Sequence, residues 1–208
     1  MTPDLPQQQE IIQRLEQDRE EALAELYQLV RERLRRVIDF RLDHRLTGRV
    51  SNSDVLQETY VRAAQRIDSY LEKPDMPFFV WLRLEANQRL QEIHRFHFGA
   101  EKRDIRREVK PIGKQGQGNT SVQLAAHIVA QMTSPSGVFQ KAQQIDALEK
   151  TLSEMNDTDR EVIALRHFEE LSNIETAKVL GIEPEAASKR YIRALKRLKE
   201  IMQQHAAF

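Results

Sequence analysis

The sequence predicts an all-α protein: two small helical domains joined by a flexible linker, with a helix-turn-helix in the C-terminal domain. Apolar residues recur at spacings of three and four over most of the chain, and no stretch alternates as a β-strand does. Residues 110–118, KPIGKQGQG, contain a proline, three glycines and no apolar period, as a linker does. Residues 171–199 contain two amphipathic stretches separated by a glycine. We therefore expect an N-terminal domain at 8–108, a linker at 109–139 and a C-terminal domain at 140–205.

Composition limits the chemistry that this chain can use. Its 208 residues contain 32 Lys and Arg and 32 Asp and Glu, so nucleic-acid binding has to be argued from the distribution of charge and not from its total. The absence of cysteine excludes disulfides, thiolate metal sites and cysteine catalysis. No run approaches the roughly 18 apolar residues of a membrane span, and the N-terminus lacks the pattern of a signal peptide. We therefore expect a cytoplasmic protein without a membrane span.

Four helices are expected in the N-terminal domain. The first covers residues 8–15, and Asp18 is placed to cap the second, whose first turn carries two acids. Ser51 and Ser53 are candidate caps of the third. The fourth covers residues 78–98, and its core stripe is expected to contain Phe79, Leu82, Ala86, Leu90 and Ile93.

The third helix carries a polar face. Asp54 and Glu58 lie one turn apart and share this face with Gln57. The opposite, apolar side of the helix is expected to anchor it through Val55, Leu56 and Val61. Residues 70–77 contain two prolines and are expected to form the loop that leads to the fourth helix.

The C-terminal domain is expected to contain helices over 138–155 and 157–168, preceded by a short one over 121–132. The helix-turn-helix follows. Ser172 and Glu175 have the spacing of a capping box, Gly181 suits a left-handed helix end, and Pro184 suits the first turn of the next helix.

The second helix of this motif has one apolar and one basic face. Its buried face is expected to contain Ala187, Tyr191, Leu195, Leu198 and Met202. The opposite stripe contains Glu185, Ser188, Lys189, Arg193, Lys196 and Lys199. Six basic residues and no acid lie between Ala186 and Lys199, whereas a merely solvated face more often mixes the two signs. The pattern favours a helix that lies in the major groove of DNA, and the alternative is an ordinary helical hairpin with a solvated outer face.

Aromatic and basic residues alternate around the fourth helix. The aromatic residues are Tyr70, Phe78, Phe79, Trp81, Phe96 and Phe98, and the basic ones are Arg83, Arg89 and Arg95. Single-stranded nucleic acid is bound by such combinations of stacking platforms and positive charge. The alternative interpretation places Phe79 and Trp81 in the core.

The sequence contains no motif of an enzyme or of a cofactor site. Phosphate-binding glycine loops, a nucleophile elbow and the zinc motif H-E-x-x-H are all absent. His94 and His97 have no nearby carboxylate or thiolate that would complete a metal site. We therefore expect no enzymatic activity, no cofactor and no metal.

Three stretches together resemble the extracytoplasmic-function (ECF) group of sigma factors, within the sigma-70 family of bacterial RNA polymerase. Residues 54–60, DVLQETY, resemble the helix that binds the core enzyme. Residues 78–95, FFVWLRLEANQRLQEIHR, resemble the helix that melts the promoter and reads the minus-ten element. Residues 159–198, which include REVIALRHFEELSNIETAKVLGI and KRYIRALKRLK, resemble the helix-turn-helix that reads the minus-thirty-five element. All three occur in the order of that group.

The resemblance implies roles for particular residues. Core polymerase would be bound by Asp54, Gln57 and Glu58. The minus-ten element would be bound and melted by Tyr70, Trp81, Arg83, Asn87, Arg89 and Arg95, with the arginines on phosphates. The minus-thirty-five element would be read by Glu185, Ser188, Lys189, Arg190, Arg193 and Lys196. The implied partners are core RNA polymerase, promoter DNA and an anti-sigma factor.

Two alternatives remain open at this point. One is a helix-turn-helix regulator that binds duplex DNA without polymerase. The other is a helical adaptor in which the basic stripe only faces solvent.

Overall fold

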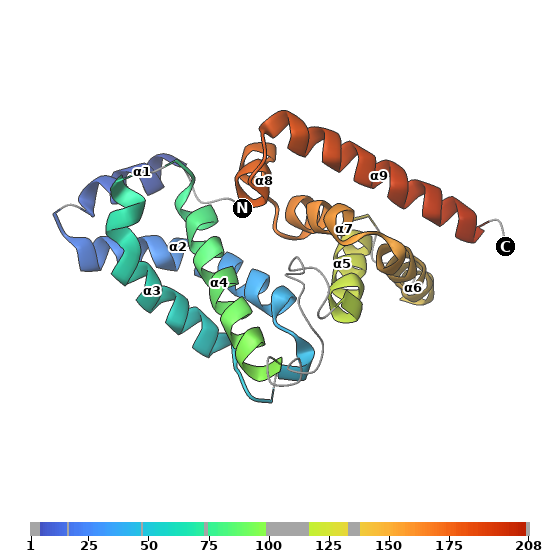
Figure 1. Cartoon of the computed structure of the whole chain (residues 1–208), viewed down its shortest axis with the longest axis horizontal. Coiled ribbons are helices and arrows are strands. Elements are labelled where there is room, and N and C mark those ends of the chain that lie inside the picture. Colours follow the sequence, from blue (N-terminus) through green and yellow to red (C-terminus); the bar gives the residue numbers. More distant parts are fainter. Residues whose placement is uncertain are drawn as a thin grey trace, which may run out of the picture. The chain divides into compact units, whose positions relative to one another are not determined.

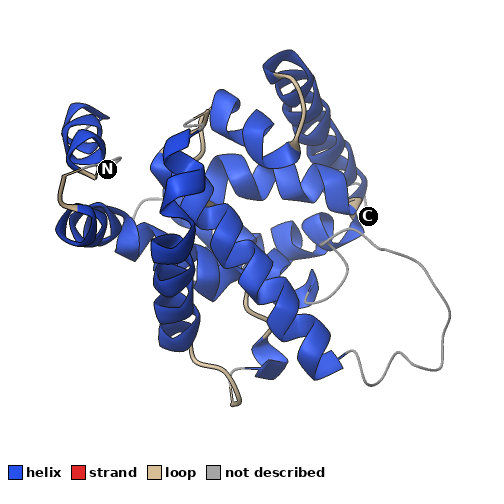
Figure 2. Cartoon of the chain, turned by 60° about the vertical axis from the view of Figure 1, so that its left-hand side comes forward, coloured by secondary structure: helices blue, strands red, loops and turns tan. Residues whose placement is uncertain are grey.

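The computed structural model describes residues 5–15, 17–46, 48–72, 75–98, 117–132 and 138–206, and every regular element in them is a helix (Figures 1 and 2). Contacts divide the chain into two compact units. Unit 1 consists of Met1–Leu42 and Leu46–Glu101, and unit 2 of Asp43–Arg45 and Lys102–Phe208. The all-helical fold class is confirmed.

Unit 1 is a bundle in which α2 contacts every other long helix. Its helices are α1 (Leu5–Arg14), α2 (Arg19–Arg41), α3 (Asn52–Glu72) and α4 (Phe78–Phe98), and the short 3₁₀ helix η1 (His44–Leu46) lies where the chain passes between the two units. The predicted core stripe of α4 is buried in full, and it meets apolar side chains of α2 and α3 such as Leu34, Ile38 and Ile67. Side-chain pairs such as Arg66 with Glu85 and Glu58 with Arg89 show that α3 and α4 run antiparallel.

Local signals determine where the helices of unit 1 begin. The Asp18 carboxylate accepts a hydrogen bond from the Glu21 N–H at 3.4 Å and caps α2 as predicted.

Tyr27 on α2 donates its hydroxyl proton to the Leu56 carbonyl at 2.9 Å and ties α2 to α3. Burial, the largest influence on this phenol, raises its pKa.

Unit 2 is built around two long helices and the helix-turn-helix. Its elements are α5 (Gln117–Met132), α6 (Val138–Glu154), α7 (Asp157–Ile163), the π-turn η4 (Ala164–Phe168), α8 (Asn173–Leu180) and α9 (Pro184–Ala206). α9 contacts α6, α7 and α8 (Figure 1). The single helix predicted over 157–168 is therefore divided into α7 and a π-turn. Its cap is Asn156, whose side-chain oxygen accepts a hydrogen bond from the Asp159 N–H at 2.8 Å.

The segment predicted as a linker, 109–139, contains a helix of unit 2. α5 packs against α6 and η4 because Leu124, Ala125 and Val129 form an apolar stripe that is buried there. The glycine-rich residues 109–116 of the predicted linker lie outside the described residues.

Packing of α9 differs from the apolar stripe that the sequence predicts. Ala187, Ala194 and Ile201, one heptad apart, are buried, whereas Leu195 and Met202 are exposed. Small alanines let α9 approach its neighbours closely, and this contact rotates the larger apolar side chains to the flank of the helix. Ile174 on α8 is exposed as well.

Across the described ranges we find no helix of the length and apolarity that a membrane crossing requires.

Candidate nucleic-acid and protein interfaces

The polar face of α3 begins at a capping box. The Ser51 hydroxyl accepts a hydrogen bond from the Asp54 N–H at 3.1 Å, and the Asp54 carboxylate accepts one from the Ser51 N–H at 3.2 Å. Asp54 and Gln57 are exposed, as an intermolecular contact requires. Val61 is also exposed, one turn after Gln57. Val61 therefore lies on the exposed side of α3 next to Gln57 and does not anchor the helix, which corrects the sequence-based expectation.

Glu58 is engaged within unit 1. Arg89 on α4 donates from Nε and Nη2 to the two carboxylate oxygens of Glu58, and the Nη2–Oε1 distance is 3.0 Å. Arg89 also donates to Glu92 at 3.3 Å, one turn further along α4. The hydrogen bonding of Arg89 to the Glu58 carboxylate is the largest of the influences that raise the pKa of Arg89. The structure thus ties together a predicted polymerase contact and a predicted phosphate contact.

Two further charged contacts join α3 to α4. Arg66 donates to both oxygens of the buried Glu85 at 2.9 Å, and Arg62 pairs with Glu92. The Arg62 hydrogen bond is the main cause that lowers the pKa of Glu92. We call Glu58, Arg62, Arg66, Glu85, Arg89 and Glu92 the α3–α4 charge ladder. It fixes the polar face of α3 relative to α4.

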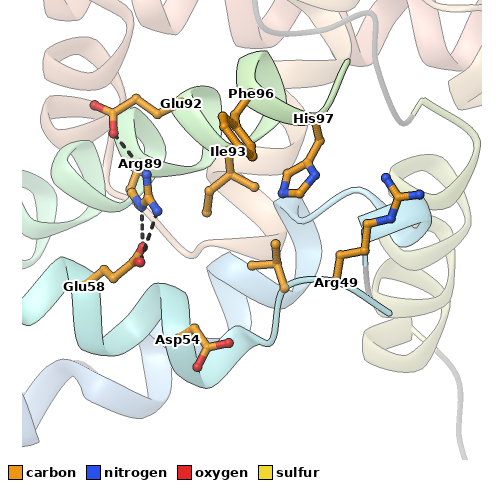
Figure 3. Close-up of a pocket in the computed structure, with 9 residues that line it drawn as sticks. Arg49, Asp54, Glu58, Arg89, Glu92, Ile93, Phe96 and His97 are labelled. Atoms are coloured by element: carbon orange, nitrogen blue, oxygen red, sulfur yellow. Dashed lines mark hydrogen bonds and ion pairs between the residues drawn. The ribbon is translucent and has the colours of Figure 1, made fainter. Parts of the chain in front are cut away.

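A pocket of about 510 Å³ opens beside this ladder, between the start of α3 and the end of α4. Its lining residues are Arg49, Val50, Asp54, Glu58, Arg89, Glu92, Ile93, Phe96 and His97 (Figure 3). Figure 3 shows the pair of Glu58 and Arg89 on one side and Arg49 on the other. The pocket therefore combines apolar, acidic and basic groups from both helices.

Tyr70 lies in the last turn of α3 and not in a loop. The loop predicted over 70–77 starts after Glu72, and residues 73 and 74 lie outside the described part. The Tyr70 ring is buried, lies 5.0 Å from Trp81 and 5.8 Å from Phe78, and its hydroxyl donates to the Met76 carbonyl at 3.2 Å. Burial raises the pKa of Tyr70 to about 12. Tyr70 therefore supports the half-buried Trp81. Its own ring is buried and is not open for a base to stack on.

Arg83 is a core residue. Its exposed fraction is 1%, because it follows Phe79 by one turn and precedes Ala86 by another, so it shares their buried stripe. Arg83 is therefore buried in this structure, in contrast to the accessible phosphate contact that the resemblance implies. The other predicted contacts on α4 remain accessible: Asn87 is half-buried and Arg95 is exposed.

The helix-turn-helix has the local geometry that the sequence predicts. Ser172 and Glu175 form the reciprocal capping box, with distances of 3.2 and 2.7 Å. Gly181 ends α8 in the left-handed region, at φ 63° and ψ 37°. Asn173 donates from its side chain to the Pro184 carbonyl at 2.8 Å and links the start of α8 to the start of α9. These contacts determine the angle at which α9 leaves the turn.

α9 presents most of its predicted DNA contacts to solvent. Glu185 and Lys189 are 89% and 80% exposed, and their charged groups lie 3.7 Å apart. Arg193 and Lys196 are exposed on the following turns, whereas Ser188 and Arg190 are half-buried. The exposed basic stripe attracts DNA phosphates whatever the DNA sequence. Glu185 and Lys189 lie on the first turns of α9, and in this motif the first turns of the second helix reach base edges.

The inner side of α9 is held by polar contacts. His167 in η4 forms a hydrogen bond of 2.8 Å with the Tyr191 hydroxyl. Burial is the main cause that lowers the pKa of His167, and Arg166 and His127 lower it further. The buried Arg160 of α7 donates to the Leu152 and Met155 carbonyls at 3.1 and 3.3 Å. The contact between His167 and Tyr191 attaches α9 to η4, and the contacts of Arg160 attach α7 to the end of α6.

Sequence reasoning did not single out the pocket or its apolar part. Val50 precedes α3, and Ile93 and Phe96 lie near the end of α4. Spacing gave no signal for Phe96, because a residue three positions after Ile93 continues the core stripe of α4, yet its side chain is 80% exposed in the structure.

Comparisons with known proteins find a matching family model and similar proteins. The family model for sigma-70, region 4, matches residues 145–198, which contain the helix-turn-helix. RNA polymerase sigma factor CnrH from Cupriavidus metallidurans is 27% identical over 149 residues, or 72% of each chain. The ECF RNA polymerase sigma factor SigW from Bacillus subtilis is 24% identical over 173 residues, which cover 82% of this chain and 83% of SigW.

A solved structure of CnrH in complex with the cytosolic domain of CnrY supports the fold. Its TM-score with this chain is 0.52 at 20% identity, and the match covers 93% of this chain and 96% of that one.

Proposed function

We propose that this chain, a homologue of the ECF sigma factors with a sigma-70 region 4 domain, is a sigma factor: it binds core RNA polymerase and directs promoter recognition, DNA melting and transcription initiation. The observation that carries this function is the match of residues 145–198 to region 4, on a helix-turn-helix whose second helix exposes a basic stripe. The resemblance read from the sequence and the two relatives agree.

Recognition of the minus-thirty-five element is assigned to α9. Glu185 and Lys189 are exposed on its first two turns and contact base edges. Arg193 and Lys196 follow on the exposed stripe and bind phosphates. Ser188 and Arg190 are half-buried and contribute at the edge of this surface.

Recognition and melting of the minus-ten element are assigned to α4. Trp81 offers a partly exposed ring, Asn87 a side-chain amide and Arg95 an exposed cation. Tyr70 supports the ring of Trp81 from behind. Arg83 is excluded by burial, and Arg89 is committed to two glutamates, so neither is proposed as a phosphate contact.

Core polymerase binding is assigned to the exposed part of the α3 face. Asp54 and Gln57 make the direct contacts, and their polar groups suit a basic partner surface. Glu58 shares its carboxylate with Arg89 and orients the face from within.

The chain supplies specificity and the polymerase supplies the chemistry, so we propose no catalytic residue and no cofactor. This function places the protein in the cytoplasm with the transcription machinery. An anti-sigma factor that covers these surfaces is proposed as a further partner.

The test is a pull-down with purified core polymerase, followed by promoter-specific transcription. We expect a stoichiometric complex, and transcripts that depend on the added chain. The double variant Asp54→Asn with Gln57→Ala should weaken the complex while circular dichroism stays helical, because asparagine still accepts the capping hydrogen bond from Ser51. Tight binding to duplex DNA without polymerase would favour the one-component regulator, and binding to neither would favour the helical adaptor.

A further inference from the structure

We propose that the polymerase-binding surface extends from α3 into the pocket under Phe96, at the end of α4. The occupant is a segment of core polymerase that presents an apolar side chain next to an arginine or lysine. This inference rests on the proposed function and adds to it a contact region on the helix otherwise assigned to promoter DNA.

Shape and position are the first argument. The pocket of about 510 Å³ is lined by Asp54 and Glu58, two of the three residues predicted from sequence to bind polymerase. A surface drawn through the exposed face of α3 therefore continues into the pocket without a break. Concave sites of this size hold a side chain with its neighbours far better than a flat helix face does.

The apolar part of the pocket is the second argument. Val50, Ile93 and Phe96 line it from two segments of the chain (Figure 3). Phe96 is 80% exposed, and the centroid of its ring lies 5.1 Å from that of the adjacent His97. The ring thus adds little to the core of unit 1, whereas a buried aromatic ring is a frequent anchor of protein interfaces.

The charge of the pocket lining favours a protein segment over nucleic acid as the occupant. Three carboxylates line the pocket, from Asp54, Glu58 and Glu92. Arg89 is engaged by Glu58 and Glu92, so the exposed Asp54 carboxylate is the acid that is open to a partner. The lining also contains Arg49 and Arg89, so carboxylates outnumber arginines by three to two, and a basic residue of a protein segment is favoured over a phosphate.

The experiment measures the affinity of the full chain for core polymerase, by fluorescence anisotropy of labelled protein. Phe96→Ala should weaken binding at least tenfold, while Phe96→Leu, which keeps an apolar side chain, should retain most of it. Urea midpoints should stay unchanged, because the ring is largely outside the core. Val122→Ala is the control: it truncates an exposed aliphatic residue on α5 and should bind as wild type does.

Several outcomes would overturn the inference. Equal affinities of Phe96→Ala and wild type would remove the pocket from the interface. Equal affinities with lower permanganate reactivity of the minus-ten thymines would instead make Phe96 a stacking platform for DNA. A wild-type chain that does not bind polymerase would overturn the proposed function, and this inference with it.

Discussion

The charged residues of α3–α4 and those of α9 look alike in sequence but differ in the folded protein. On α3 and α4, residues predicted to bind polymerase or phosphate pair with one another, as Glu58 does with Arg89. On α9, Lys189, Arg193 and Lys196 stay exposed, and the pair of Lys189 with Glu185 is itself open to solvent.

The difference follows from how many sides of a helix are covered. α4 is packed against both α2 and α3, so its charged residues lie at borders between helices and find partners there. α9 is covered on one side by α6, α7 and α8, and its exposed side carries mostly charged and polar residues with a few apolar ones. A basic stripe is therefore better evidence for a binding surface on a one-sided helix than on a helix within a bundle.

The largest effect on stability is expected from substitution of Arg83, because its burial contrasts most with the exposed charges of α9. Arg83→Ala should lower the free energy of unfolding by about 2–5 kcal/mol, because removal of a long core side chain leaves a cavity. Arg95→Ala, on the exposed side of the same helix, should change it by less than about 0.5 kcal/mol. Urea denaturation followed by the fluorescence of Trp81, the single tryptophan, reports on unit 1. Equal stability of the two variants would contradict a core role of Arg83 and would leave DNA binding as its expected role.

The next effect concerns the division of labour on α9. Lys189→Ala should reduce discrimination among minus-thirty-five sequences by roughly 1–3 kcal/mol if its base contact is bidentate. Lys196→Ala should weaken all sequences alike and reduce the salt slope by about one ion. Holoenzyme binding to a panel of promoter variants at several salt concentrations separates the two effects. A uniform loss for Lys189→Ala would leave Glu185 and Ser188 as the residues that read bases.

A smaller effect is expected for the ladder contact between Glu58 and Arg89. A double-mutant cycle with Glu58→Gln and Arg89→Gln should give a coupling free energy of about 0.5–1 kcal/mol, because both side chains are partly exposed to solvent. Trp81 fluorescence in urea again supplies the measurement. No coupling, together with a lower salt slope for Arg89→Gln in DNA binding, would show that Arg89 acts on phosphate after all.

The smallest effect is a pH dependence of unit 2. The pKa of His167 is lowered in the folded state from its ordinary value of 6.5, so the unfolded chain binds a proton more readily. The stability that neutral His167 contributes is therefore present above about pH 6.5 and is lost as the pH falls through the lower, folded pKa. Hydrogen exchange of α9 amides between pH 7 and 5 should show faster opening at low pH, and His167→Gln should flatten this trend. A trend that is identical in the variant would assign it to another group.

The sequence by itself determined the helix-turn-helix, most of the helices and the caps of α2 and α8. Ser172, Glu175, Gly181 and Pro184 act on backbone groups within a few residues of themselves, so their effect is local and can be read from spacing. The same holds for Asp18 and for the core stripe of α4. Helical periodicity also indicates that Arg83 is buried, because residue 83 lies on that stripe.

Only the tertiary structure decided which charged and apolar side chains stay open. Glu58 and Arg89 are 31 positions apart, and their contact depends on the rotation of α3 against α4. The pocket depends on the same rotation, because it joins Asp54 to Phe96. On α9, the choice of Ala187, Ala194 and Ile201 as the packed edge left Leu195 and Met202 exposed. Helical periodicity restricts a residue to one face, and the packing of neighbouring helices determines which face is covered.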